Sequence, residues 1–333
     1  MSHFTVAVIT KGEPTLEKIA KALAPFQENN MDDCPKEYLT FHSLSKEYKD
    51  TYENGTTERV KLKDGTLVYT WSDKLYKNVS KEEYEEAKAN GKPADYSYTS
   101  AGTTYKVKLD LTEIGAELVT IPWKELYSTF EEYLEDYLDA KKDEETLDYG
   151  YWENPNAKWD WYEVGGRWAG SLKVASNCEN CGVGTKSWGW GNEDPYASTD
   201  RYKKVDSARI KELVFPDYQE KYNKAKRFWE LKVEGQIPKN DSERELLKLN
   251  FYRTEYYTNT YKDKKTYAEC EATFSTYAVI DKEGHWCAKG EMGWWGYSSE
   301  EENQVVDFIK NYKEKVFDSA DDDDYITIVD CHI

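Results

Sequence analysis

HFTVAVIT at His3–Thr10 decides the fold, together with its counterpart YITIVDCHI at Tyr325–Ile333. Each is a short, mainly apolar run rich in Val, Ile and Thr, as expected of a buried strand. Strands at both ends of a chain with helices between them are typical of an α+β fold. We therefore expect a mixed or antiparallel sheet that contains both terminal strands, packed by helices around an aromatic-rich core.

The segments between these strands predict a single compact α+β unit, residues 1–333, with a helical insertion at about 207–266. An amphipathic helix is expected from Pro14 to about Ala24, and another from about Lys124 to Lys141. A strand, a turn at Lys282–Gly284 and a second strand precede a last helix. No internal repeat or long linker is visible, which favours one unit.

The composition excludes several classes of function. The chain of 333 residues has a formal net charge of −19, so we expect no duplex nucleic-acid binding through phosphates, whereas a basic host protein remains a possible partner. No stretch resembles a membrane span or a signal peptide, so we expect no membrane association. Six scattered cysteines predict reduced thiols rather than a disulfide scaffold.

The motif WDWYEVGGRW at Trp159–Trp168 is the strongest candidate for a binding site. Alternation in a strand places Trp159, Trp161 and Glu163 on one face, and Asp160, Tyr162 and Val164 on the other. Two glycines then remove side chains where a planar ligand could lie, and an arginine framed by indoles suits a phosphate attached to a stacked base. The candidate ligand-binding residues here are Trp159, Trp161, Tyr162, Arg167 and Trp168. The alternative is a tight hairpin whose indoles fill the core and whose Arg167 pairs with Asp160 or Glu163.

A second motif, GEMGWWGY, adds Trp294 and Trp295 to the candidate ligand-binding residues. A turn that exposes two adjacent tryptophans is costly unless a ligand, a partner or another part of the chain covers them. Together with SWGWGNEDPY at Ser187–Tyr196, these turns favour an aromatic, glycine-walled pocket.

A third group joins the two terminal strands. If these strands are neighbours, His3 and His332 lie close together and share one site with Asp330 and Cys331. With Glu291, such a group suits general acid–base work or a divalent metal, so His3, Asp330, His332 and Glu291 are the candidate catalytic residues. The alternative is that they are ordinary polar strand ends.

Cys178 and Cys181 resemble half of a zinc site. A structural zinc needs four ligands, and His285 with Cys287 or Cys331 with His332 are the available complements. We expect no cofactor, with zinc at Cys178 and Cys181 as the one exception considered and a free-thiol loop as the alternative.

Several motifs together resemble a known family. They are MSHFTV at the start, LAPF, DGTL, SYTS, NPNAKWDWYEVGGRW at Asn154–Trp168, GEMGWWG at Gly290–Gly296 and VDCHI at the end. In this order they are similar to a family of uncharacterised bacteriophage proteins. The resemblance implies a phage product made in the host cytoplasm, and it implies no particular activity.

Three functions follow from these residues. The first is a phage accessory protein, of counter-defence type, that binds a nucleotide-like or other small host molecule. The second is an acidic inhibitor that binds a host defence enzyme, and the third is a metal-assisted hydrolase. The sequence lacks a Walker loop, a GxSxG motif and kinase motifs, which favours a binding protein over an enzyme.

Overall fold

The computed structural model describes residues 2–100, 102–179, 181–182, 184–186, 194–248, 252–293, 298–299 and 304–333. The chain divides into two compact units. Unit 1 comprises residues 1–40 and 153–333, and unit 2 comprises residues 41–152. The sequence analysis expected one unit and did not separate 41–152. None of the described helices is long and apolar enough to cross a membrane.

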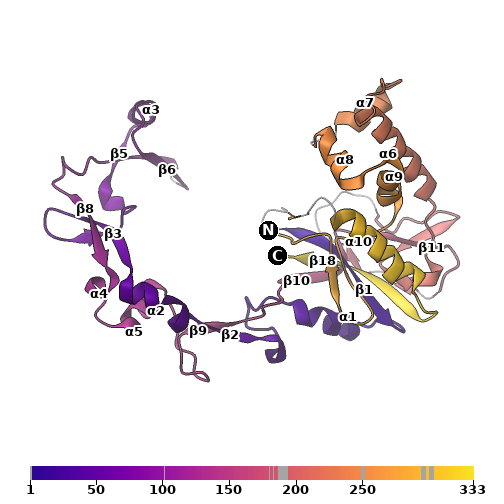
Figure 1. The fold of residues 1–333 in the computed structure, drawn as a ribbon, viewed down its shortest axis with the longest axis horizontal. Helices are drawn as coiled ribbons and strands as arrows, with labels where there is room; N and C mark the ends of the chain where they lie inside the picture. The colour runs from indigo at the N-terminus through magenta and orange to yellow at the C-terminus, as the bar shows by residue number, and fades with distance from the viewer. Residues whose placement is uncertain are drawn as a thin grey trace. The chain divides into compact units, whose positions relative to one another are not determined.

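Unit 1 is built on a mixed sheet with the strand order β12-β15-β18-β1-β16-β17. Its strands are β1 (His3–Lys11), β12 (Cys181–Gly182), β15 (Ser207–Arg209), β16 (Ala278–Ile280), β17 (Trp286–Ala288) and β18 (Asp324–His332). The terminal strands β1 and β18 lie side by side, antiparallel, from His3↔His332 to Lys11↔Asp324, whereas β1 and β16 are parallel (Figure 1). The expected α+β fold with both terminal strands in one sheet is confirmed.

A second set of short strands extends this sheet or flanks it. They are β10 (Trp161–Gly166), β11 (Leu172–Ala175), β13 (Thr185–Lys186) and β14 (Tyr202–Val205). Strand β10 pairs with the last residues of β18, and β15 pairs with the same edge of β18 nearer its start. One edge of β18 is therefore paired first with β15 and then with β10. Strand β13 pairs with the end of β10, at Gly165 and Gly166.

Helices cover both faces of the sheet. Helix α10 (Gln304–Tyr312) and the π-helical turn η7 (Lys313–Asp318) pack on the face that includes Ala7 and Ile328. Helix α1 (Leu16–Leu23) packs on the opposite face, which includes Val6 and Val329. Because side chains alternate along a strand, His3, Asp330 and His332 lie on the α10 face of the sheet.

The remaining helices of unit 1 form an aromatic block. They are α6 (Tyr218–Lys232), α7 (Asp241–Lys248), α8 (Thr254–Tyr261) and α9 (Lys264–Ala272), with the short 3₁₀ turns η1 (Ala24–Phe26), η2 (Lys36–Tyr38) and η5 (Ile210–Glu212) elsewhere. Phe228, Trp229, Tyr257, Tyr261 and Tyr267 pack together between these helices. Helices are thus present where the insertion was expected.

Unit 2 has the small sheets β4-β3-β8 and β5-β7-β6, and the paired strands β2 and β9 include the two points in the chain where this unit begins and ends. Its elements are β2 (Thr40–Ser43), α2 (Leu44–Asn54), β3 (Thr56–Lys61), β4 (Leu67–Val68), η3 (Asp73–Leu75), β5 (Tyr76–Val79), α3 (Lys81–Ala89), β6 (Ala94–Thr99), β7 (Gly102–Lys108), β8 (Glu117–Pro122), α4 (Trp123–Leu126), α5 (Phe130–Glu132), η4 (Tyr133–Tyr137) and β9 (Gly150–Glu153). The continuous helix expected over Lys124–Lys141 is wrong. Thr129 caps a new helix by accepting from the backbone N–H of Glu132, so the chain forms short turns instead.

Candidate functional site

His3 lies at the first position of β1 and contacts β18. The pairing register places Thr5 opposite Asp330, so His3 and Asp330 are diagonal neighbours on the same face. Nδ1 of His3 lies 2.8 Å from Oδ1 of Asp330, whose carboxylate is completely buried. The two terminal strands thus form a histidine–carboxylate pair.

His332 forms a second such pair at the other side of β18. Its Nδ1 lies 2.6 Å from Oδ1 of Asp160, the residue directly before β10. The rings of His3 and His332 are 4.9 Å apart and nearly perpendicular, and the indole of Trp161 contacts His3 edge-on at 6.1 Å. The structure therefore brings together three of the four candidate catalytic residues, and it adds Asp160.

The two pairs have the same chemical consequence. An ionised carboxylate only accepts hydrogen bonds, so each histidine donates through Nδ1–H and leaves Nε2 with its lone pair. Each imidazole side chain is 14% exposed, so a small part of it is reachable from solvent. When one ring is neutral and the other is protonated, Nε2 of the first can accept a proton and Nε2 of the second can donate one.

The glycine pair of β10 does not leave room for a ligand. Gly165 and Gly166 have φ of +80° and +55°. A Cβ at Gly165 would lie 2.6 Å from Oδ2 of Asp206, and one at Gly166 would lie 2.6 Å from Oδ2 of Asp330. The two carboxylates fill this space, so the expectation that the glycines clear a surface for a planar ligand is wrong.

Asp206 is the centre of a buried hydrogen-bond network that the sequence did not reveal. Its oxygens accept from the backbone N–H of Gly170 and of Gly184 at 2.6 Å, and from the hydroxyl of Tyr196 at 2.6 Å. Burial, with the hydrogen bond to Asp206 second, raises the pKa of Tyr196. This carboxylate fixes the loops that follow β10 where the sheet edge passes from β10 to β15.

Arg167 follows the glycine pair and is exposed. Its backbone N–H donates to Oδ2 of Asp330 at 2.9 Å, so the residue is anchored to the carboxylate that holds His3. The alternative in which Arg167 pairs with Asp160 or Glu163 does not occur, because Asp160 binds His332 and the guanidinium has no ion pair among the described residues.

The aromatic candidates divide between core and surface. Trp159 is 4% exposed and donates through Nε1 to the carbonyl of Leu23, and Tyr162 packs against it at 5.1 Å. Trp168 packs against the core on the α10 face. Trp161, at 49% exposed, is the accessible indole of this motif. Trp294 and Trp295 lie outside the described residues.

Glu291 does not join the histidines. It lies within 3.9 Å of Lys158 and lines a cavity of about 1170 Å³ beside β17, and neither histidine of the pair lines that cavity. Cys331 also departs from the expected site, because alternation directs it to the α1 face, where burial raises its pKa. The site thus contains His3, His332, Asp330 and Asp160.

The Cys178 and Cys181 thiols form local hydrogen bonds. Cys178 donates to Oε2 of Glu212 at 3.2 Å, and Cys181 donates to the carbonyl of Cys178. Burial and the bond to Glu212 raise the pKa of Cys178 to about 12, which opposes the thiolate that zinc requires. Within the described ranges, Cys178 and Cys181 belong to no group of three potential metal ligands whose donor atoms all lie close to one another.

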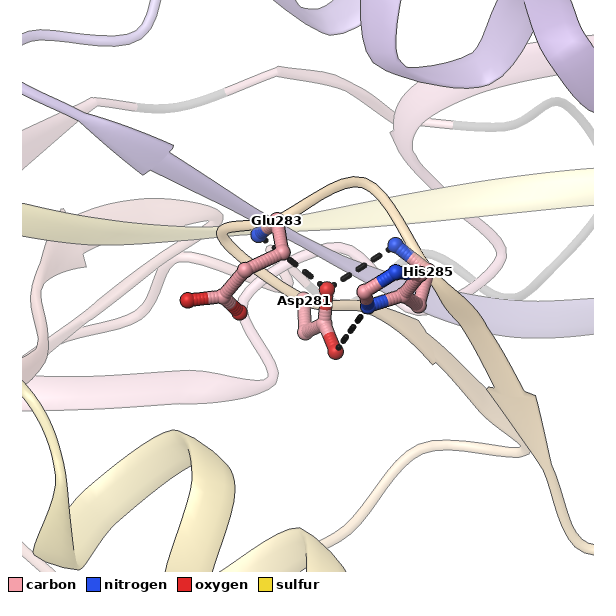
Figure 2. A group of neighbouring side chains, drawn as sticks. All are labelled: Asp281, Glu283 and His285. Atoms are coloured by element: carbon pink, nitrogen blue, oxygen red, sulfur yellow. Dashed lines mark hydrogen bonds and ion pairs between the residues drawn. The ribbon is translucent and has the colours of Figure 1, made fainter.

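Asp281, Glu283 and His285 are the one described group with the spacing of metal ligands. Figure 2 shows why this group has a structural explanation: Oδ1 of Asp281 accepts the backbone N–H of Glu283 and of His285, which closes the turn between β16 and β17. Lys315 also lies 3.7 Å from the Asp281 carboxylate. The positive charge of Lys315 and the hydrogen bonds of the turn compete with a metal cation for the Asp281 carboxylate.

The acidic run Asp321–Asp324 is largely paired. Asp322 binds Lys211, and Lys282 lies within ion-pair distance of both Asp321 and Asp324. These contacts reduce the negative field that a basic partner would meet here. Comparison of the chain with family models, with curated proteins and with solved structures gave no match.

Proposed function

We propose that unit 1 binds a small nucleotide-like molecule at the two-histidine site and cleaves a phosphate ester bond in it by acid–base catalysis. One observation supports this most: two imidazoles 4.9 Å apart each lie within hydrogen-bond distance of a separate carboxylate. Each of these rings is partly exposed, and a carboxylate beside Nδ1 of each is the arrangement that orients an imidazole for proton transfer. This arrangement favours turnover over the non-catalytic binding expected from the sequence.

The reaction needs one base and one acid. Nε2 of one neutral histidine accepts a proton from water while the water oxygen attacks phosphorus. The bond from phosphorus to the leaving oxygen breaks, and that oxygen receives the proton of the second histidine, which enters as imidazolium. The products are an alcohol and a phosphate with one ester bond fewer. Asp330 and Asp160 stabilise the imidazolium forms and hold both rings in place.

This scheme does not use a metal. Catalytic zinc sites use three protein ligands. A carboxylate at Nδ1 is compatible with a metal at Nε2, but the described residues add no third ligand near both rings. Acid–base chemistry therefore fits the donor set better than the metal-assisted hydrolysis considered from the sequence.

Arg167 and Trp161 suit the binding of such a ligand. The guanidinium of Arg167 is exposed, has no ion pair among the described residues and belongs to a residue anchored to Asp330. A free guanidinium binds phosphate through two parallel hydrogen bonds. The half-exposed indole of Trp161 beside His3 offers a stacking surface for a base.

The resemblance to bacteriophage proteins gives this activity a biological role. In the host cytoplasm, an enzyme that removes a nucleotide signal would act as a phage counter-defence protein. Cyclic oligonucleotides and ADP-ribose derivatives are the natural first probes, because both contain phosphate esters and stacking bases.

The test is chromatography of these probes after incubation with the full chain. We expect a cleaved product and a bell-shaped dependence of rate on pH, as one neutral and one protonated histidine require. His3→Ala and His332→Ala should each reduce the rate about 10²–10⁴-fold. His285→Ala is the matched control, since His285 is exposed on a turn of the same unit. Binding without cleavage would overturn the catalytic part, and absence of both would overturn the proposal.

A further inference from the structure

Unit 2 contains a buried arginine whose charge has no carboxylate partner. Arg59, in β3, is 6% exposed, and its guanidinium makes no ion pair with any residue that the structure describes. Arginine is almost never buried this far unless it is paired, because removing the charge from water is unfavourable. An anion that paired with this guanidinium would therefore supply an interaction that the described part of the chain does not.

Aromatic rings hold the guanidinium in place. Cζ of Arg59 lies 4.1 Å from the ring centroid of Tyr69 and 5.5 Å from that of Trp123. These two residues follow β4 and β8, the strands on either side of β3. Trp71 stacks on Tyr69 at 4.7 Å and so supports one of the two rings. Cation–π contacts offset part of the cost of burial and fix the guanidinium before any ligand binds.

One edge of the guanidinium is tied to the protein and the other is open. Nη1 donates to Oγ1 of Thr57 at 2.6 Å and to the carbonyl of Glu58 at 2.9 Å. Nε and Nη2 donate to no described residue. Neither nitrogen is among the fully enclosed polar atoms that lack a hydrogen bond, so solvent reaches this edge. The open edge carries two parallel N–H donors, the fork that matches a carboxylate or a phosphate.

Arg227 in unit 1 shows what the same edge binds elsewhere in this chain. Its Nε and Nη2 donate to the two oxygens of Glu243, at 2.9 and 2.8 Å. We infer that the Nε–Nη2 edge of Arg59 is a binding site for an oxyanion, a carboxylate or phosphate group, which accepts the same two parallel hydrogen bonds. The residues that form this site all belong to unit 2, so the inference does not depend on the reaction proposed for the histidines.

The experiment follows the Nε–H resonances of the arginines by NMR while inorganic phosphate or acetate is added to the full chain at constant ionic strength. We expect the resonance of Arg59 to move saturably, with a dissociation constant on the order of 1 mM. The resonance of Arg227 should stay in place, because Glu243 occupies its edge. Movement with both anions is the expected result, and movement with one alone would identify the group that the site prefers. No movement with either anion, or equal movement at Arg227, would overturn the inference.

Arg59→Lys keeps the charge and removes the fork. This variant assigns the Arg59 resonance, and phosphate should no longer raise its unfolding temperature above that in chloride, as it should for the native chain. Arg244→Lys, at an exposed arginine of unit 1, is the matched control and should keep the full response. An Arg59→Lys variant that keeps the response would contradict the inference. If this variant does not fold, the titration of the native chain still decides the question.

Asp136 is the carboxylate of the chain that competes for this site. Burial raises the pKa of Tyr127, and the charge of Arg59 opposes this rise while that of Asp136 adds to it, so both charges act on the same hydroxyl. Asp136→Asn should therefore strengthen phosphate binding about twofold. Glu86→Gln, at an exposed position of α3 in the same unit, should leave the affinity unchanged. Weaker phosphate binding in Asp136→Asn would count against an anion at Arg59.

Discussion

Asp206 and Asp330 occupy equivalent positions at the glycine pair of β10 and differ in what they bind. Both carboxylates are completely buried, and each fills the space that a side chain at one glycine would need. Asp206 accepts from two backbone amides and from Tyr196, all within the protein. Asp330 accepts from one backbone amide, at Arg167, and from the imidazole of His3.

Under the proposed function, this difference separates a structural carboxylate from one that orients a catalytic histidine. The hydrogen bonds of Asp206 end at backbone amides and a tyrosine of the same fold, so its charge stabilises the folded loops. One hydrogen bond of Asp330 continues to a ring that solvent can reach, so its charge orients a group that can react. The same packing of a carboxylate against a glycine therefore serves folding at Gly165 and the histidine site at Gly166.

The largest effect is expected for removal of the structural carboxylate. Asp206→Ala leaves one buried N–H group, one partly buried N–H group and one hydroxyl without an acceptor, so it should lower the free energy of unfolding by about 3–6 kcal/mol. Asp330→Ala leaves the N–H of Arg167 and the partly exposed imidazole of His3 without an acceptor. It should therefore lower the free energy of unfolding about half as much. Denaturant unfolding followed by tryptophan fluorescence measures both. Equal losses in the free energy of unfolding would show that the two carboxylates contribute equally to stability, against this prediction.

The sequence predicts one of these carboxylates and not the other. The apolar runs at the two ends of the chain predict strands β1 and β18. Because these strands are paired, His3, Asp330 and His332 lie close together. Asp206 is a lone aspartate before a short strand, and its three donors come from positions 10 to 36 residues away in the chain. Such contacts have no local pattern. The sequence did not predict Asp160 as a partner of His332. Asp160 precedes β10, so the alternation of side chains along a strand does not predict which way its carboxylate points.

The division of the chain was also invisible in the sequence. Unit 2 begins at Phe41 and ends at Trp152, within the paired strands β2 and β9. Ordinary strand residues at a boundary have neither the glycine nor the proline content of a linker. The fold class could be predicted because it depends on local periodicity, whereas the boundary depends on long-range pairing.

The next effect distinguishes the two glycines. Gly165→Ala and Gly166→Ala each place a side chain at positive φ and against a carboxylate, so each should cost about 2 kcal/mol of stability. Their effects on the proposed turnover should differ, because only Gly166→Ala displaces Asp330 and with it His3. We expect at least a tenfold loss of rate in Gly166→Ala and little loss in Gly165→Ala under conditions where both are folded. A variant at Gly65, which is also at positive φ but has open space around its Cβ position, measures the backbone strain alone.

The smallest effect tests the network of Asp206 through pH. Tyr196→Phe removes one hydrogen bond to a carboxylate and should cost about 1 kcal/mol at neutral pH. The folded pKa of Tyr196 is raised above its unfolded value of about 10, so its contribution is complete below pH 10 and declines as pH rises above that value. The stability difference between the native chain and Tyr196→Phe should therefore narrow above pH 10.

Other buried tyrosines, such as Tyr312, also have raised pKa values and destabilise both proteins alike at high pH, so the difference in stability between the two proteins isolates Tyr196. A difference that stays constant up to the highest pH at which both fold would mean that Tyr196 is not held neutral by Asp206.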